Sequence, residues 1–370
     1  MSGNICDVRS TCIWREIHEQ PEAIRHALTG SLPVIERISE EVRRREIDLI
    51  VLVARGTSDH AALYGQYIFQ YLNGIPVALA TPSIVTLYGA RLHLQHALVI
   101  GISQSGVAPD VTGVIEQARE VGALTVGITN VEGSLLANAA EYALYCAAGA
   151  ELSVAATKTY TTTCAILAQL AAHLPGGESL TGYINHLPDL TEVALSSEES
   201  VAGVVQRYVH ARDCVVLGRA FNYSTARETA LKLTETCYLV ATPFSTADFR
   251  HGPTAIIEFG RTVVLYAPAG RTLADNYELL KFLKEREADT IVIAEDPRLL
   301  DLATTPILAQ LPALNGSISG HEASAPIDVA ELLSPIPNII YGQFLAMYLS
   351  VSKGLNPDRP RGLTKVTRTM

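Results

Sequence analysis

A strand, a short polar turn and a helix follow one another twice in this chain, about half a chain apart. The first copy covers residues 48–69 (DLIVLVARGTSDHAALYGQYIF) and the second covers residues 213–233 (DCVVLGRAFNYSTARETALKL). In both copies a continuous apolar run precedes the turn, and apolar residues at helical spacing follow it. Because a buried strand that leads into a helix is the building unit of parallel sheets, the repeat predicts two related α/β domains.

Further apolar runs follow each copy. IPVALA, HALVIGIS, LTVGITN and YALYCAA come after the first, and RTVVLYAP and DTIVIAE come after the second, with helical patterns over residues 111–121 and 276–287. Fully apolar strands that alternate with helices are typical of a parallel sheet covered on both faces. The expected divisions are an N-terminal helical segment (1–34), a first domain (35–175), a linker that begins within 174–188, a second domain (195–330), and a C-terminal helix with a docked tail (331–370).

The charge and the cysteines of the chain exclude several classes of binding partner and of structural site. The 370 residues carry a formal net charge of −10 without a Lys/Arg-rich run, so we expect neither nucleic acid nor a membrane as a partner. The six cysteines are scattered without a C-x-x-C pair, which disfavours a structural zinc site or a disulfide framework. No metal or other cofactor is expected. The chain begins without an apolar signal region and has no run of membrane-spanning length, so we expect a cytoplasmic protein.

A cluster of small hydroxylated residues interrupts the stretch VIGISQSGVAPDV (residues 99–111). In open α/β sheets, ligands bind beyond the carboxyl ends of the strands, where amides and the helix dipole favour an anion. The turn RGTS takes the same position after the first strand. Such residues commonly serve only to cap helices and turn the chain, but two such turns on adjacent strand ends favour a phosphate cradle. The cradle residues are Gly56, Thr57, Ser58, Ser103, Gln104 and Ser105.

A second group of chemically active residues lies in the second half. Glu228, Lys232 and Glu235 are spaced i, i+4 and i+7, so they share one face of a helix. By itself this pattern is typical of a solvated salt-bridge stripe, and His251, before a Gly-Pro turn, is typical of a structural histidine. Beside a phosphate cradle, the same carboxylate, lysine and histidine would suit proton transfer next to a carbonyl.

Seven motifs, in order, resemble a known family. EIHEQP, GTS, ISQSG, AELSVAATKTY, ALKLTET, RHGP and PRGLTK occur with the order and approximate spacing of the isomerase half of glutamine:fructose-6-phosphate amidotransferases. The resemblance implies two sugar isomerase (SIS) domains, each with a five-stranded parallel sheet of flavodoxin-like order flanked by helices. It also implies a homodimer.

The resemblance also implies roles for single residues. Glu235 would move the proton between C1 and C2 of the sugar, and Lys232 would support it. His251, reaching in from the other subunit, would open the sugar ring, and Lys365 would form a Schiff base with a ketose. The residues expected to bind the sugar phosphate are those of the cradle, together with Val154 and Ala156 of the AELSVAATKTY motif.

Departures from the family pattern refine the expected reaction. Where the synthases usually read SQSGET, residues 103–108 of this chain read SQSGVA, so Val107 and Ala108 replace the glutamate and the threonine. Ala156 likewise replaces a serine of the synthase motif. With these replacements, and with its short motifs PD (109–110), SVAATK (153–158) and ETC (235–237), the chain more closely resembles SIS-type glucosamine-6-phosphate deaminases. Position 2 is Ser2 and only about 35 residues precede the first predicted domain, so we expect no glutaminase domain.

The expected function is therefore the isomerisation of a phosphorylated amino sugar with release of ammonia, from glucosamine 6-phosphate to fructose 6-phosphate, without a cofactor. Three alternatives stay open: a deglycase of another phosphorylated sugar–amine adduct, an ammonia-dependent glucosamine-6-phosphate synthase, and a non-catalytic phosphosugar-binding regulator. The presence of Glu235, His251 and Lys365 argues against the regulator, because a sensor needs only the cradle.

Overall fold

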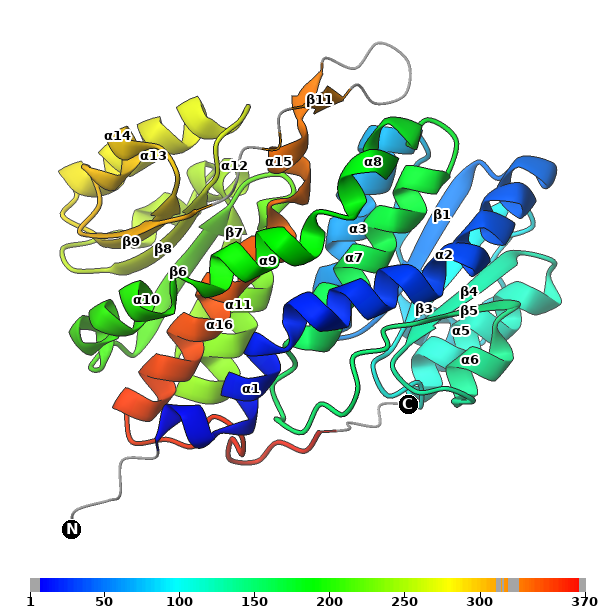
Figure 1. Cartoon of the computed structure of the whole chain (residues 1–370), viewed down its shortest axis with the longest axis horizontal. Helices are drawn as coiled ribbons and strands as arrows, with labels where there is room; N and C mark the ends of the chain where they lie inside the picture. The colour runs from blue at the N-terminus through cyan, green and yellow to red at the C-terminus, as the bar shows by residue number, and fades with distance from the viewer. Residues whose placement is uncertain (1–6, 311–313, 315, 319–325, 366–370) are drawn as a thin grey trace.

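Two five-stranded sheets occupy separate halves of the molecule, with long helices around and between them (Figure 1). The computed structural model describes residues 7–310, 314, 316–318 and 326–365. Ser2 and one of the six cysteines, Cys6, lie outside the described residues.

The first sheet confirms the predicted flavodoxin-like order. Its strands are β1 (Leu49–Val53), β2 (Val77–Leu79), β3 (Ala97–Ile102), β4 (Leu124–Thr129) and β5 (Tyr142–Tyr145). They are all parallel, in the order β2-β1-β3-β4-β5. Every residue of β3 and β4 is buried, which explains their continuous apolar sequences.

The second sheet repeats this order. Its strands are β6 (Asp213–Gly218), β7 (Val240–Ser245), β8 (Thr262–Ala267), β9 (Asp289–Ala294) and β10 (Thr305–Leu308). They are parallel and run β7-β6-β8-β9-β10 across the sheet. The edge strands β7 and β10 were not among the predicted strands. Both are only partly buried, and each contains a proline, which edge strands tolerate.

The helices of the first half begin with a short N-terminal helix followed by a long one. They are α1 (Cys12–His18), α2 (Gln20–Arg44), α3 (Thr57–Asn73), α4 (Pro82–Thr86), α5 (Pro109–Glu120), α6 (Leu135–Ala139) and α7 (Lys158–His173). The expected division after residue 34 falls inside α2. This helix continues because its buried apolar stripe extends through Ile35, Ile38 and Val42.

The second half contains shorter helices and one long C-terminal helix. They are α8 (Thr181–Ile184), α9 (Leu187–Leu195), α10 (Glu198–Val204), α11 (Asn222–Cys237), α12 (Thr246–Arg250), α13 (Leu273–Glu285), α14 (Pro297–Leu300), α15 (Val329–Leu333) and α16 (Pro335–Ser352). Single 3-10 turns are η1 (Val8–Ser10), η2 (Glu178–Leu180), η3 (Val205–Tyr208) and η4 (Pro253–Ile256). A small antiparallel pair joins β11 (Ser317–Ile318) to β12 (Ile327–Asp328). The linker region that begins at 174–188 is thus largely helical.

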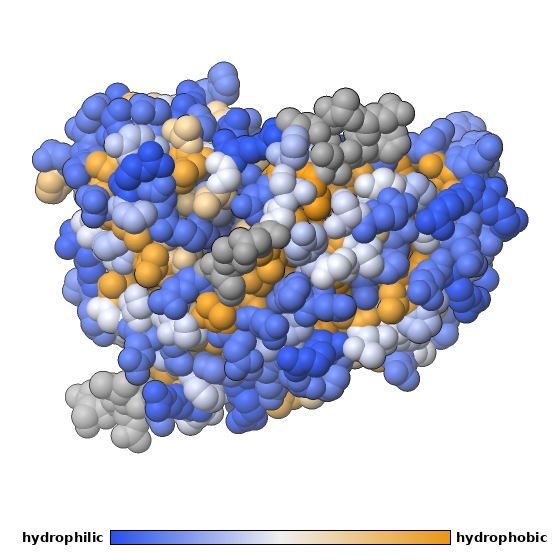
Figure 2. Space-filling model, turned by 45° about the horizontal axis from the view of Figure 1, so that its top comes forward, coloured by the Kyte–Doolittle hydropathy of each residue, from blue (hydrophilic) through white to orange (hydrophobic). Residues whose placement is uncertain are grey.

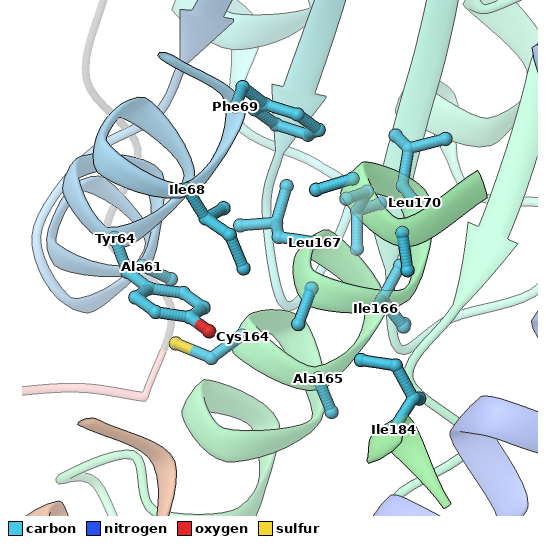
Figure 3. Close-up of a cluster of buried hydrophobic side chains, with 14 of the residues drawn as sticks. Ala61, Tyr64, Ile68, Phe69, Cys164, Ala165, Ile166, Leu167, Leu170 and Ile184 are labelled. Atoms are coloured by element: carbon cyan, nitrogen blue, oxygen red, sulfur yellow. The ribbon is translucent and has the colours of Figure 1, made fainter. Parts of the chain in front are cut away.

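The core of the first half places α3 firmly against α7. Tyr64, Ile68 and Phe69 of α3 face Cys164 and Leu167 of α7 (Figure 3), and all five are fully buried. Each such large side chain contributes about 1.5–3 kcal/mol through burial. This packing fixes the start of α3 at the carboxyl edge of the sheet.

One face of the protein is seen in a space-filling view. Figure 2 shows a face covered largely by hydrophilic residues, with hydrophobic residues in small separate patches. None of the described helices is long and apolar enough to cross a membrane.

Candidate active site

A cavity of about 370 Å³ opens at the carboxyl edge of the first sheet. Its walls come from the turns after β1 and β3, the loop before α7, helix α11 and the C-terminal tail. The residues that line it are Arg55, Gly56, Thr57, Ser58, Ser103, Gln104, Ser105, Ala108, Val154, Ala156, Glu235, Leu363, Thr364 and Lys365. The structure therefore brings the predicted cradle together with Glu235 and Lys365, which are far apart in sequence.

The two cradle turns depend on glycine. Gly56, with φ +55°, immediately precedes α3 and has no side chain to cap its first amides. Gly106 has φ +64°, and a Cβ there would lie 2.1 Å from the hydroxyl oxygen of Ser134. The Gly106 amide donates to Ser103 Oγ over 3.2 Å, which closes the turn after β3. The start of α3 and this closed turn thus present amides and hydroxyls that suit a phosphate.

Arg55 is a cradle residue that the sequence analysis did not single out. Its Nε lies 2.6 Å from Asp110 Oδ2 at the start of α5, while about half of the arginine side chain stays exposed. The ion pair joins the turn after β1 to the helix after β3. It therefore fixes the spacing of the two cradle turns and adds a positive charge beside them.

The predicted face of α11 points at the cradle. Lys232 Nζ lies 3.2 Å from Glu228 Oε1, 2.7 Å from Glu235 Oε2 and 3.2 Å from Thr57 Oγ1. Side chains of Glu228 and Lys232 are buried, whereas Glu235 is 22% exposed and lines the cavity. The alternative of a solvated salt-bridge stripe is therefore wrong, because α11 packs against α3 and turns this face inward.

His60 extends the network and was also missed. Its Nδ1 lies 2.7 Å from Glu228 Oε2, and the Thr57 hydroxyl donates to Glu228 Oε1 over 2.9 Å. Burial by itself would raise the pKa of Glu228, but Lys232, His60 and Thr57 outweigh it and lower that pKa. Burial would likewise lower the pKa of Lys232, but its two carboxylates outweigh it and raise that pKa. The network therefore holds a buried carboxylate and a buried ammonium, both charged.

The C-terminal tail closes one side of the cavity. Asp358 accepts hydrogen bonds of 2.8 Å from the amides of Cys12 and Ile13 at the start of α1. Further along the tail, the backbone amide of Arg361 donates a hydrogen bond of 2.8 Å to the Tyr238 hydroxyl. The guanidinium carbon of Arg361 lies 4.3 Å from the centroid of the Tyr238 ring. These contacts bring Lys365 to the cavity, where its ammonium lies 2.7 Å from Glu151.

His251 lies elsewhere in the chain. It is an exposed residue that follows α12, beyond the edge strand β7. Among the described residues it does not line the cavity that holds Glu235. The structure of one chain therefore brings together every predicted site residue except His251, with Lys232 buried behind Glu235.

The arrangement can bind an anion and move a proton. Hydroxyls, amides and Arg55 form an electropositive, hydrogen-bonding end of the cavity, and the partly exposed Glu235 carboxylate forms a basic group nearby. Among the described residues, no group of three or more His, Cys, Asp or Glu side chains is arranged to hold a metal ion. The described part of the chain has five free cysteines, of which only Cys12 is not buried.

Comparison with known proteins agrees with the motifs. The SIS domain family model matches residues 45–173 and 208–298, one stretch in each half. A curated relative from Pyrococcus horikoshii, named glutamine–fructose-6-phosphate aminotransferase (isomerizing), is 35% identical over 356 residues. That match covers 95% of this chain and 56% of the relative, so the chain spans little more than half of that protein.

Solved structures share the whole architecture. A putative phosphosugar isomerase from Silicibacter pomeroyi is 31% identical with a TM-score of 0.79, and the match covers 94% of this chain and 100% of that one. A glucosamine-6-phosphate deaminase from Thermotoga maritima shares the fold, with a TM-score of 0.75 at 20% identity over 97% of this chain and 100% of that one. The chain therefore belongs to the SIS domain family, as its motifs predicted.

Proposed function

We propose that this protein is a phosphosugar isomerase that converts glucosamine 6-phosphate and water to fructose 6-phosphate and ammonia. One observation carries the proposal: Glu235 and Lys365 share a single cavity with the hydroxyls of Thr57, Ser103 and Ser105. A phosphate in the cradle would place the carbon chain of the sugar toward these two groups.

In the proposed reaction, Glu235 removes the proton from C2 of the open-chain amino sugar and returns it to C1. The 2-amino aldose becomes a ketose imine, and water then hydrolyses the imine to the ketose and ammonia. The buried Lys232 ammonium, 2.7 Å from Glu235, holds the carboxylate in place during both transfers.

Ring opening must precede this proton transfer. We propose that His251 of a second subunit performs it, because within one chain this exposed residue lies outside the lining of the described cavity. The active form would then be a homodimer. We propose that Lys365 forms a Schiff base with the ketose, so that its position affects turnover in both directions of the reaction.

Two residues in the cavity favour deamination over synthesis. Ala108 and Ala156 both line the cavity, and neither offers a hydroxyl where the synthase pattern has one. The Thermotoga maritima protein with the same fold is named a glucosamine-6-phosphate deaminase, which supports this assignment.

The decisive experiment is to incubate the purified protein with glucosamine 6-phosphate and to follow ammonia and fructose 6-phosphate. We expect both products in equal amounts. Unphosphorylated glucosamine is the matched control, and we expect it to react poorly because it cannot occupy the cradle. Failure to release ammonia from any 2-amino sugar phosphate would contradict the proposal.

Synthesis is the second candidate, because the Pyrococcus horikoshii relative is named an aminotransferase. Fructose 6-phosphate with ammonium, and separately with glutamine, tests this direction. Most ammonia is protonated at neutral pH and has no lone pair for a carbonyl, so we expect synthesis from ammonium to be weak. Rapid formation of glucosamine 6-phosphate, without measurable hydrolysis, would favour the synthase.

A further inference from the structure

Glu151 is a buried carboxylate beside the cavity that the proposed reaction does not use. Its Oε1 accepts hydrogen bonds from the amides of Thr157 (2.9 Å) and Thr159 (3.1 Å). Its Oε2 accepts from the Thr159 hydroxyl over 2.8 Å and lies 2.7 Å from Lys365 Nζ. One side chain thus joins a loop, the start of α7 and the C-terminal tail.

The start of α7 favours an ionised carboxylate at this position. Thr157, the residue before α7, makes no side-chain capping bond, and Glu151 takes that role from outside the helix. Burial by itself would raise the pKa of Glu151, but Lys365 and the amides of Thr157 and Thr159 outweigh it and lower that pKa. A buried negative charge needs a partner, and the Lys365 ammonium supplies it.

The loop between Glu151 and α7 forms part of the cavity wall. Val154 and Ala156 of this loop line the cavity. The Val154 amide donates to the backbone oxygen of Asp358 in the tail over 3.3 Å. The wall of the cavity and the tail are therefore fixed to each other at two points, Asp358 and Lys365.

We propose that Glu151 is a positioning residue that docks Lys365 at the cavity and fixes the loop of Val154 and Ala156. A carboxylate with four donors has little freedom to move, so the lysine reaches the cavity at a defined place. This inference rests on the proposed function for its effect on turnover, whereas docking of the tail can be measured without any substrate.

Docking is tested by trypsin cleavage after Arg361, an exposed residue of the tail that contacts Tyr238. We expect the docked tail to be cleaved more slowly than a released one, because its backbone is held by these contacts. Cleavage of this kind follows the population of the open form. We expect Glu151→Gln to accelerate cleavage by about tenfold. Glu22→Gln is the control: it removes an exposed ion pair with Arg25 on α2. Its cleavage rate should equal that of the unmodified protein.

Two further variants keep the test decisive if Glu151→Gln does not fold. Lys365→Met removes the same ion pair from the tail side, where the side chain is 24% exposed, and should accelerate cleavage to a similar extent. Glu151→Asp keeps the charge and should restore part of the protection.

For turnover of glucosamine 6-phosphate, Glu151→Gln should lower kcat by about tenfold with KM changed less than about twofold, because the cradle lies on other loops.

Unmodified cleavage rates in both Glu151→Gln and Lys365→Met would overturn the docking of the tail by Glu151. An unmodified kcat in Glu151→Gln, with the tail released, would overturn its role in positioning Lys365 for reaction. If the unmodified protein released no ammonia, the proposed function would fail, and the cleavage rates would still decide whether Glu151 docks the tail.

Discussion

At the carboxyl edge of the first sheet, the turns after β1 and β3 read RGTS and SQSG, and a cavity of about 370 Å³ lies beside them. At the same place in the second sheet, the turns after β6 and β8 read RAFN and PAGR. Ion pairs lie at this second edge: Asp275 is 3.7 Å from an Arg219 nitrogen and 3.0 Å from an Arg250 nitrogen. The turn after β8 lines a cavity of about 330 Å³ whose other residues include Tyr277 and Arg298, and among the described residues no turn like SQSG faces it. Related backbones thus carry different side chains at equivalent edges.

Both halves nevertheless contain the same ion pair at this edge of the sheet. Each half places an arginine after its first strand and an aspartate in the helix after its third, and the two form an ion pair, Arg55 with Asp110 and Arg219 with Asp275. In the second half, the start of α11 is additionally covered, because Asn222 bonds to Ser334 and Asn338. The first half therefore carries the proposed binding edge, and the second half supplies a helix face that reaches it.

The largest expected effect tests the contribution of that helix face. Glu235→Gln should lower kcat for ammonia release by about 10²–10⁴-fold, because the amide cannot accept the C2 proton. Fructose 6-phosphate binding, measured by calorimetry, should change little, since the cradle belongs to the first half. Glu278→Gln, which removes an exposed ion pair with Lys281, is the control and should be fully active. Near-normal turnover by Glu235→Gln would remove this face of α11 from the chemistry.

His251 also belongs to the second half, and mixed dimers test how it contributes. Neither His251→Ala nor Glu235→Gln alone should be active. A heterodimer of the two has one complete site if His251 acts across the interface, so it should show about half the activity of the unmodified dimer. Differently tagged subunits would verify exchange. No recovery in a verified heterodimer would place His251 in its own subunit's site, whereas full activity of His251→Ala alone would place it outside the reaction.

Glu228 joins the two halves, so its replacement should weaken the whole protein. Glu228→Gln leaves buried Lys232 and His60 without their shared partner and should lower the free energy of unfolding by about 3 kcal/mol. Because the folded pKa of Glu228 lies below its ordinary value of 4.5, its contribution is complete above that pH. It is lost as the pH falls further.

Denaturant unfolding at about pH 7 and about pH 4 measures this difference, which should shrink at the lower pH. Glu258→Gln, which removes an exposed ion pair with Arg261, is the control and should change stability by less than about 1 kcal/mol. An equally small effect of Glu228→Gln would show that the buried network does not hold the halves together.

The sequence predicted those parts of the fold whose signal is local. β3, β4, β8 and β9 are continuous apolar runs because both faces of each sheet are covered. The edge strand β7 was missed because it is half exposed and carries no such run. The extension of α2 past residue 34 was also missed, although its apolar stripe continues through Ile35, Ile38 and Val42 beyond the internal Pro33.

The same distinction applies to the candidate site. Glu228, Lys232 and Glu235 could be grouped because their spacing within one helix puts them on one face. His60 and Glu151 could not, because their partners lie 168 and 214 residues away and meet only through the packing of α3, α11 and the tail. Local spacing shows which residues share a face, but not what that face meets.

The smallest expected effect compares the two edges directly. Ser103→Ala removes a cradle hydroxyl and should raise KM for glucosamine 6-phosphate by about tenfold, with little change in kcat, because phosphate contacts stabilise ground and transition states alike. Arg219→Gln at the second edge is the matched variant, and its KM should stay within about twofold, since Arg219 is paired with Asp275 there. Initial rates across a range of substrate concentrations separate kcat from KM.

An unchanged KM in Ser103→Ala would remove the cradle from substrate binding. A large rise in KM for Arg219→Gln would show that the second edge also takes a sugar phosphate, and the contrast between the halves would fail.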